Sequence, residues 1–227
     1  MRGILERIES LNEATYEKDR EYRDTAISFY NALIKWSKGK DAWDYLGNRV
    51  FKASKFWKHP MAKKLTIAFR SYAQRKRAKR DVSGGSMSLW GNMVVYIPND
   101  GRPFDEQIPR DTIIHEMIHF LDPGIGKGAL VKTGSKEYFI HSSEWNAFWQ
   151  QGADALEDRI GNSSKYAMSI KRVLGNGSWK EFSRKSMLYW NSSFLKNLDE
   201  KYKKKFDKRL YQLWEALKKK GVFDDKN

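Results

Sequence analysis

The sequence predicts a mainly helical α+β protein that holds one small mixed sheet. Apolar residues recur at steps of three and four along most of the chain, which is the spacing of helices packed on a core. Residues 87–97 are instead rich in strand formers and lead into the turn cluster at residues 98–101. The 227 residues are enough for one sizeable core with helical additions.

The N-terminal part of the chain is predicted to be a helical, basic arm or subdomain over residues 1–82. Residues 14–37 carry apolar side chains at helical spacing. Asp41 can cap a second helix that extends to Phe51, and Pro60 can begin a third that continues through Tyr72. The glycine-rich residues 83–86 end this part of the chain.

The central part, residues 83–162, is predicted to hold the sheet and two core helices. We expect one or two strands in residues 87–97 and then a helix from Pro109 or Arg110 to the Asp-Pro-Gly sequence at 122–124. A loop with four glycines follows over residues 124–136. Ser142 or Ser143 can cap the next helix, over residues 144–160.

The C-terminal part, residues 163–227, is predicted to form basic helices that pack on the core. One or two long helices are expected within residues 179–220. Their apolar side chains recur at three- and four-residue steps, so they are expected to be core residues: Trp190, Phe194, Leu198, Tyr202, Phe206, Leu210, Leu213 and Leu217.

The charge of the chain is strongly basic and unevenly distributed. Lysine and arginine number 43 against 28 acidic residues. Residues 51–80 hold eleven basic and no acidic residues, and residues 165–220 hold sixteen basic and five acidic ones. Such segments indicate an anionic partner, with non-specific nucleic acid as the main candidate. The alternative is that they are solvated helix faces that keep the protein in solution.

The cysteine count and the hydropathy pattern indicate the compartment. The chain has no cysteine, which excludes disulfides and thiolate zinc sites and fits a reducing compartment. The charged N-terminal segment does not resemble a signal peptide, and no apolar run approaches the ~20 residues of a membrane span. We therefore expect a cytoplasmic protein, or one released from the cytoplasm by lysis or packaging.

The motif most informative about function is His-Glu-x-x-His at residues 115–119. Positions 115 and 119 lie on one face of a helix, so two imidazoles can bind one Zn²⁺. Glu116 is rotated by ~100° from His115, to the edge of such a site, where it can act as general base toward the water that zinc activates. The pattern is that of metalloproteases. It predicts hydrolysis of a protein or peptide substrate.

A catalytic zinc site usually has three protein ligands, and the third is not fixed by this motif. The metzincin pattern requires Gly and His where this chain has Asp122 and Ile125, so that class is excluded. The downstream candidates are His141 and Glu144. His59 is a poorer candidate because it lies in the basic arm. Asp122 could orient a ligand histidine or be solvated at the end of its helix.

The sequences HEMIHFLDP and EYFIHSSEWNAF together resemble zincin proteases of the gluzincin type, over residues 86–160. Similar families occur among phage, toxin and mobile-element proteins. The resemblance implies a zincin-like core, Glu144 as the third zinc ligand, and strand 93–97 as the edge strand along which substrate lies. In that case His141 or Tyr138 would stabilise the oxyanion at the rim of the site. Phe148 replaces the aspartate that would follow in thermolysin-like members.

A second resemblance gives a different ligand set. HSSEW at 141–145 is similar to the histidine motif of the SprT/Spartan-like proteases, although Ser142 replaces their glycine. It implies His141 as the third ligand and a solvated Glu144, in an enzyme that cleaves DNA-bound proteins. A third alternative is a basic virion or nucleic-acid-associated structural protein with an inactive zincin core.

Overall fold

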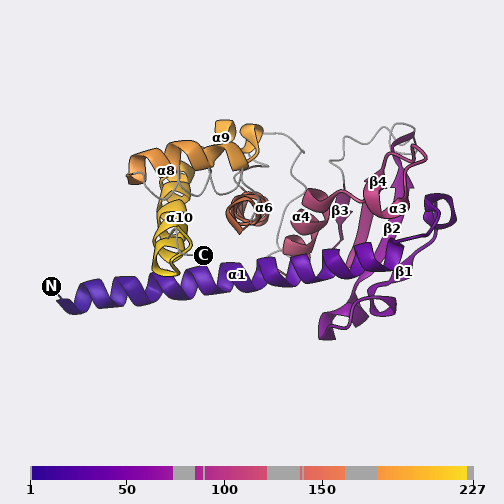
Figure 1. The fold of residues 1–227 in the computed structure, drawn as a ribbon, viewed down its shortest axis with the longest axis horizontal. Coiled ribbons are helices and arrows are strands. Elements are labelled where there is room, and N and C mark those ends of the chain that lie inside the picture. Colours follow the sequence, from indigo (N-terminus) through magenta and orange to yellow (C-terminus); the bar gives the residue numbers. More distant parts are fainter. Residues whose placement is uncertain are drawn as a thin grey trace. The chain divides into compact units, whose positions relative to one another are not determined.

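The computed structural model of the chain describes residues 2–73, 85–88, 90–121, 139, 141–161 and 178–223. Its larger helices, drawn in Figure 1, are α1 (Arg2–Ser37), α3 (Phe104–Gln107), α4 (Arg110–Leu121), α6 (Ser142–Gly161), α8 (Trp179–Ser186), α9 (Ser192–Asn197) and α10 (Glu200–Lys219). The strands are β1 (Phe51–Lys52), β2 (Thr66–Ser71), β3 (Gly85–Met87) and β4 (Asn92–Ile97). Short 3₁₀ helices occur at Ala42–Tyr45, Ala53–Lys55, Pro60–Lys64 and Met187–Tyr189.

Two compact units make up the chain. One joins Met1–Glu21 to Phe148–Asn227, and the other is Tyr22–Ala147. We call them the helical unit and the sheet unit. Helices α1 and α6 each contribute residues to both units. The boundaries predicted at residues 82 and 162 lie outside the described residues.

The sheet unit holds four strands in the order β1-β2-β4-β3. β2 and β4 are parallel, with Thr66 opposite Asn92, whereas β1 and β3 pair with their neighbours in the antiparallel sense. The predicted fold class, mainly helical α+β with a small mixed sheet, is confirmed. The prediction that residues 93–97 form an edge strand is wrong, because β4 lies between β2 and β3. Among the described strands, β1 and β3 lie at the two edges.

Two helix predictions in the N-terminal part are wrong. Asp41 caps a helix, but only the 3₁₀ helix Ala42–Tyr45. Pro60 likewise begins only the 3₁₀ helix Pro60–Lys64, and the chain then continues as β2. The apolar residues 65–69 suit a buried strand as well as a helix, and the parallel pairing of β2 with β4 selects the strand. A partner distant in the sequence therefore overrides the local spacing.

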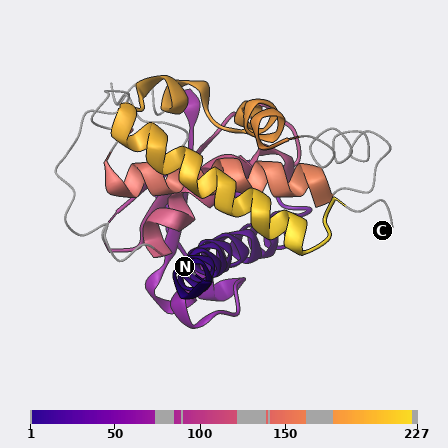
Figure 2. The ribbon, with the colours of Figure 1, turned by 90° about the vertical axis from the view of Figure 1, so that its left-hand side faces the viewer.

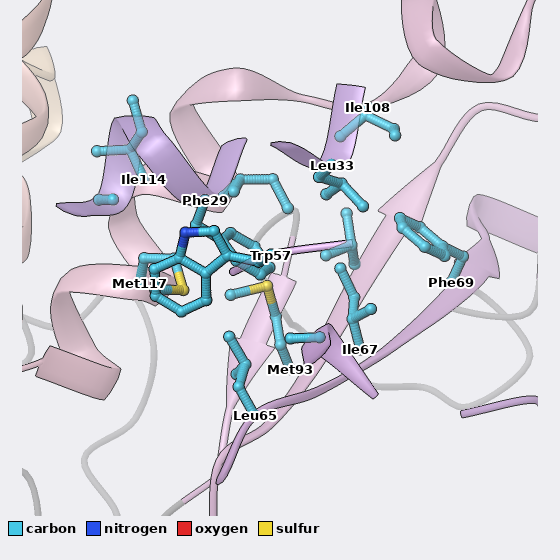
Figure 3. Packing of buried hydrophobic residues seen from close by; sticks show 14 of the residues in the cluster. Phe29, Leu33, Trp57, Leu65, Ile67, Phe69, Met93, Ile108, Ile114 and Met117 are labelled. Atoms are coloured by element: carbon cyan, nitrogen blue, oxygen red, sulfur yellow. The ribbon is translucent and has the colours of Figure 1, made fainter. Parts of the chain in front are cut away.

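The hydrophobic core of the sheet unit is formed where one face of β2 and β4 packs against helices. Ile67 and Phe69 of β2 and Met93 of β4, which lies opposite Ile67, are all buried in this core. Figure 3 shows Ile114 and Met117 of α4 packed in this cluster with aromatic and aliphatic side chains of the same unit. Helix α4 is thus a core helix. Its buried run extends from Ile113 to His119.

Aromatic side chains from α6, α9 and α10 form the core of the helical unit. Trp149 of α6 stacks on Trp190 and meets Phe206 of α10 edge-on, with ring centroids 5.3 and 5.4 Å apart. Figure 2 shows α10, in yellow, crossing in front of α6. The apolar stripe predicted to be core is buried at seven of its eight positions, Tyr202 being half-buried. The segment forms three helices where one or two were predicted.

Candidate metal centre

The His-Glu-x-x-His motif lies on α4, as predicted. The backbone N–H of Ile113 donates to the carbonyl of Pro109, at the start of the helix. His115 and His119 are each only 8% exposed, and their rings meet edge-on with centroids 4.7 Å apart. Burial of two adjacent imidazoles is costly unless their nitrogens have partners. Glu144 of the neighbouring helix α6 supplies such a partner.

Glu144 comes from the first turn of α6, which brings it to the two histidines. The backbone N–H of Trp145 donates to the carbonyl of His141 over 2.8 Å and so begins the helix. Glu144 Oε2 lies 3.2 Å from Nε2 of His115, and Oε1 lies 3.3 Å from Nε2 of His119. A carboxylate at this end of α6 is also favoured by the helix dipole.

The three side chains lie close enough together for one metal ion to bind between them. Zinc bonds of about 2.0–2.1 Å place tetrahedral ligand atoms about 3.3 Å apart. The Nε2 atoms of the two histidines lie 3.1 Å apart, and they lie 3.2 and 3.3 Å from different oxygens of Glu144. With one ligand atom from each residue, the three atoms lie within 4.8 Å of one another. Within the described residues, this is the group of histidine, aspartate and glutamate side chains that could hold a metal ion. The residues present therefore fit Zn²⁺.

The number of protons available to the three side chains also favours a bound cation. Each neutral imidazole carries at most one proton, on one of its two nitrogens. If both histidines donate from Nε2 to Glu144, the two N–H groups face each other across the 3.1 Å His–His contact. If one donates to the other, one His–Glu contact contains no proton. A cation bound between the three atoms would satisfy all of them at once.

The electrostatics of Glu144 keep it in the form that binds a cation. Burial by itself raises the pKa of the Glu144 carboxyl. Hydrogen bonds from His115 and His119 outweigh that effect and hold its pKa well below the ordinary value. Glu144 is consequently ionised throughout the neutral range. It supplies a negative charge that two neutral imidazoles would share with a bound metal.

Glu116 is buried next to the cluster, on the same helix. It is 4% exposed, and burial raises its pKa, whereas the proximity of His115 and His119 lowers it. The carboxylate of Glu144 raises it again, which is consistent with two acidic groups close to one site. A buried carboxyl that is not part of the ligand set is available to exchange a proton.

Strand β3 contacts Glu116, and sequence reasoning missed this. The backbone N–H of Met87 donates to the Glu116 carboxylate. A Cβ on Gly85 would come within 2.7 Å of Thr112 Cγ2 and 3.1 Å of Glu116 Cγ, so only glycine lets the strand lie this close to α4. Residues 83–86 were interpreted only as a break. The glycine in that segment was the available signal of a close backbone approach.

The other predicted site residues have different positions. His141 immediately precedes α6, is half-buried, and is not one of the three side chains that converge. Tyr138 and Asp122 lie outside the described residues. His59, discounted from the sequence, stacks on Trp57 and accepts a hydrogen bond from the Met61 backbone through Nδ1. That role is structural.

Comparisons with known proteins give no match, so the interpretation of the site depends on its geometry. No protein-family model matches the chain, and neither the curated proteins nor the solved structures include a match. A search of the described helices found none with the length and apolarity needed to cross a membrane.

Proposed function

We propose that the protein is a zinc-dependent metalloendopeptidase with a zincin-like core. The observation that carries this proposal is the convergence of His115, His119 and Glu144 within the reach of one metal ion, with Glu116 buried beside them. Two imidazoles, one carboxylate and a nearby second carboxyl are the set that hydrolytic zinc enzymes use.

The roles of the residues follow from their positions. His115, His119 and Glu144 would hold the ion, which when bound supplies a Lewis acid and lowers the pKa of water to about 7. Glu116 accepts the proton of the attacking water and returns it to the amine that leaves when the peptide C–N bond breaks. Burial of Glu116 keeps bulk water from competing for this proton.

The choice of Glu144 over His141 as third ligand rests on distance. Both carboxylate oxygens of Glu144 lie within 3.3 Å of a ligand nitrogen, one on each histidine. This supports the gluzincin-like arrangement and disfavours the SprT-like one, in which Glu144 would be solvated. The side chain of Glu144 is 18% exposed, which leaves it accessible at the edge of the site.

The substrate would be an extended peptide lying along β3. The resemblance gave the substrate-pairing role to residues 93–97, and we assign it to β3 instead. Of the two end strands of the described sheet, β3 is the one that contacts α4. Strand β3 already contacts Glu116 through Met87. A peptide paired with this strand would hold its carbonyl groups in register with the site. The identity of the protein substrate, the cytoplasmic location and a phage or mobile-element origin stay predictions from the sequence.

The experiment that tests the proposal is Glu116→Gln. The amide keeps the shape of the side chain but cannot take up the water's proton, so cleavage of an unfolded protein substrate should fall by about 10²–10⁴-fold. Zinc content, measured by elemental analysis, should stay at one ion per chain. Glu106→Gln, at an exposed position of the same unit, is the matched control and should retain wild-type cleavage.

Three results would contradict the proposal. Wild-type protein that takes up no zinc when zinc is supplied would remove the metal site. Unchanged cleavage by Glu116→Gln would remove the assigned general base. Zinc binding without cleavage by any variant, the wild type included, would favour the structural protein with an inactive core.

A further inference from the structure

Strand β3 contacts the candidate metal centre through its backbone, and the roles proposed above leave the effect of that contact on Glu116 unexplained. The two residues that make it, Gly85 and Met87, both lie against Glu116 of α4. Nucleic-acid binding by the basic segments stays a prediction from the sequence, because residues 75–80 lie outside the described residues.

The backbone of Met87 points to the outer edge of the described sheet. The N–H of Ser88 donates to the carbonyl of Asn92 over 2.9 Å, so these two residues form a hydrogen-bonded pair of the antiparallel ladder. Hydrogen-bonded and non-hydrogen-bonded pairs alternate along such a ladder, and Met87 lies opposite Met93 in the next pair. The N–H of Met87 is therefore directed away from β4, and the Glu116 carboxylate accepts it.

Gly85 sets the distance between the strand and Glu116. It is buried, and a Cβ at this position would lie 2.7 Å from Thr112 Cγ2 and 3.1 Å from both Glu116 Cγ and the Val94 carbonyl oxygen. Any other residue here would push the strand outward or turn Glu116 aside. Either shift would lengthen the hydrogen bond from Met87.

Glu116 needs such a partner to act as general base. Its side chain has several rotatable bonds, so burial by itself does not fix the direction of the carboxylate. Met87 supplies the hydrogen bond found for it within the part of the chain that the structure describes. A carboxylate has two oxygens, so one can accept from Met87 while the other faces the water that it deprotonates.

We infer that β3 positions the general base: Gly85 lets the strand approach α4, and the Met87 N–H holds the Glu116 carboxylate toward the metal centre. Both act through Glu116, so they are positioning residues. The inference rests on the proposed function, because only a peptidase gives Glu116 that role. The contact between Met87 and Glu116 does not depend on it and is tested separately.

The contact is tested in the full-length, metal-free protein by hydrogen exchange of single backbone amides, measured by NMR. Glu116→Ala removes the acceptor, so exchange at Met87 should accelerate at least about tenfold, as expected for a lost hydrogen bond to a charged group. The Ser88 amide, whose partner is Asn92, is the internal control and should keep its wild-type rate. Unchanged exchange at Met87 would overturn the inference, and so would equal acceleration at both amides, which would mean that Glu116 only packs against the strand.

Gly85→Ala tests the positioning itself. Displacing a catalytic group by about 1 Å can cost up to about 100-fold, so kcat should fall by about 10–100-fold. KM for the unfolded protein substrate should be unchanged, because Glu116 acts only in the transition state. Zinc content, measured by elemental analysis, should match wild type. Ser86→Ala, at an exposed position of the same strand, is the matched control and should retain wild-type kcat.

A second substitution separates positioning from general damage to the fold. Thr112→Ser removes Cγ2, the atom 2.7 Å from the added methyl group, so Gly85→Ala/Thr112→Ser should recover most of the lost kcat. Thr112→Ser alone should cleave like wild type. No recovery in the double variant would overturn the inference, as would wild-type kcat in Gly85→Ala.

Two further results separate this inference from the proposed function. A higher KM with unchanged kcat in Gly85→Ala would assign β3 to substrate pairing alone and would overturn the positioning role. Wild-type protein that binds no zinc and cleaves nothing would refute the peptidase. The exchange rate at Met87 would still decide whether the strand holds Glu116.

Discussion

Glu144 in the sheet unit and Asp19 in the helical unit are both carboxylates that lie against nitrogen-bearing side chains, Asp19 buried and Glu144 half-buried. Arg209 Nη2 donates to one oxygen of Asp19 over 3.1 Å, and Trp149 Nε1 donates to the other over 3.2 Å. Guanidinium and indole N–H groups are donors at all relevant pH values. Asp19 is therefore in a site that is complete with protein groups alone.

The cluster around Glu144 differs because its nitrogens are potential acceptors. His115 and His119 approach each other as closely as they approach the carboxylate. With Glu144 ionised and one proton on each imidazole, the two protons cannot make three separate hydrogen bonds. The difference teaches a general criterion. Donors that converge on a carboxylate stabilise a fold, whereas lone pairs that converge on one point indicate a cation site.

The largest effect expected is that of Glu144→Ala on zinc binding. Removing one of three ligands should weaken zinc affinity by more than about 100-fold, the upper range for loss of a supporting group alone. His141→Ala should retain zinc and at most reduce turnover. Both are measured by competition with a chelator. Loss of zinc in His141→Ala together with its retention in Glu144→Ala would assign the SprT-like ligand set.

The stabilities of the wild type and of Glu144→Ala also sharpen the comparison. Zinc that binds only the folded state adds about 2.7–4.1 kcal/mol when its free concentration is 100–1,000 times Kd. A chelator should therefore lower the denaturation midpoint of wild type and leave that of Glu144→Ala unchanged. A chelator effect of equal size in both would mean that zinc binds elsewhere.

A smaller effect is expected at the matching site of the helical unit. Asp19→Asn keeps the volume but removes the charge, which abolishes the ion pair between Asp19 and Arg209. The free energy of unfolding should fall by about 2–3 kcal/mol, below the 3–5 kcal/mol of a fully buried pair, because the Arg209 side chain is 20% exposed. Zinc content should match wild type. Release of zinc by this variant would break the distinction between the two sites.

The smallest expected effect concerns packing in the helical unit alone. A Cβ on Gly152 of α6 would lie 2.3 Å from the Trp190 ring, so Gly152→Ala should cost about 1–3 kcal/mol by overpacking. Gly161→Ala, at the end of the same helix, meets nothing within 4 Å and is the matched control. Urea denaturation measures both. Equal stability of the two variants would show that Trp190 can move aside at little cost.

Much of the fold could be predicted wherever the signals are local. The helix over residues 14–37 is part of α1, and the helix predicted near 144–160 is α6. Of the one or two strands predicted in residues 87–97, β4 lies within that range, whereas β3 overlaps it only at Met87. The predictions failed at residues 41–51 and 60–72. There the apolar spacing fits both helix and strand. Pairing of residues 66–71 with β4, more than 20 residues further on, selected the strand β2. Leu46 and Phe51 in turn pair with β2.

The sequence by itself determined that His115, Glu116 and His119 share one turn of a helix, because a period of 3.6 residues fixes that relation. It also determined the uneven distribution of charge. Only the tertiary structure decided that Glu144, and not His141, reaches the histidines, and that β3 lies against Glu116. Those relations join α4 to α6 and to a strand distant in the sequence. The packing of the core determines these contacts, and the spacing of residues along the sequence does not encode that packing.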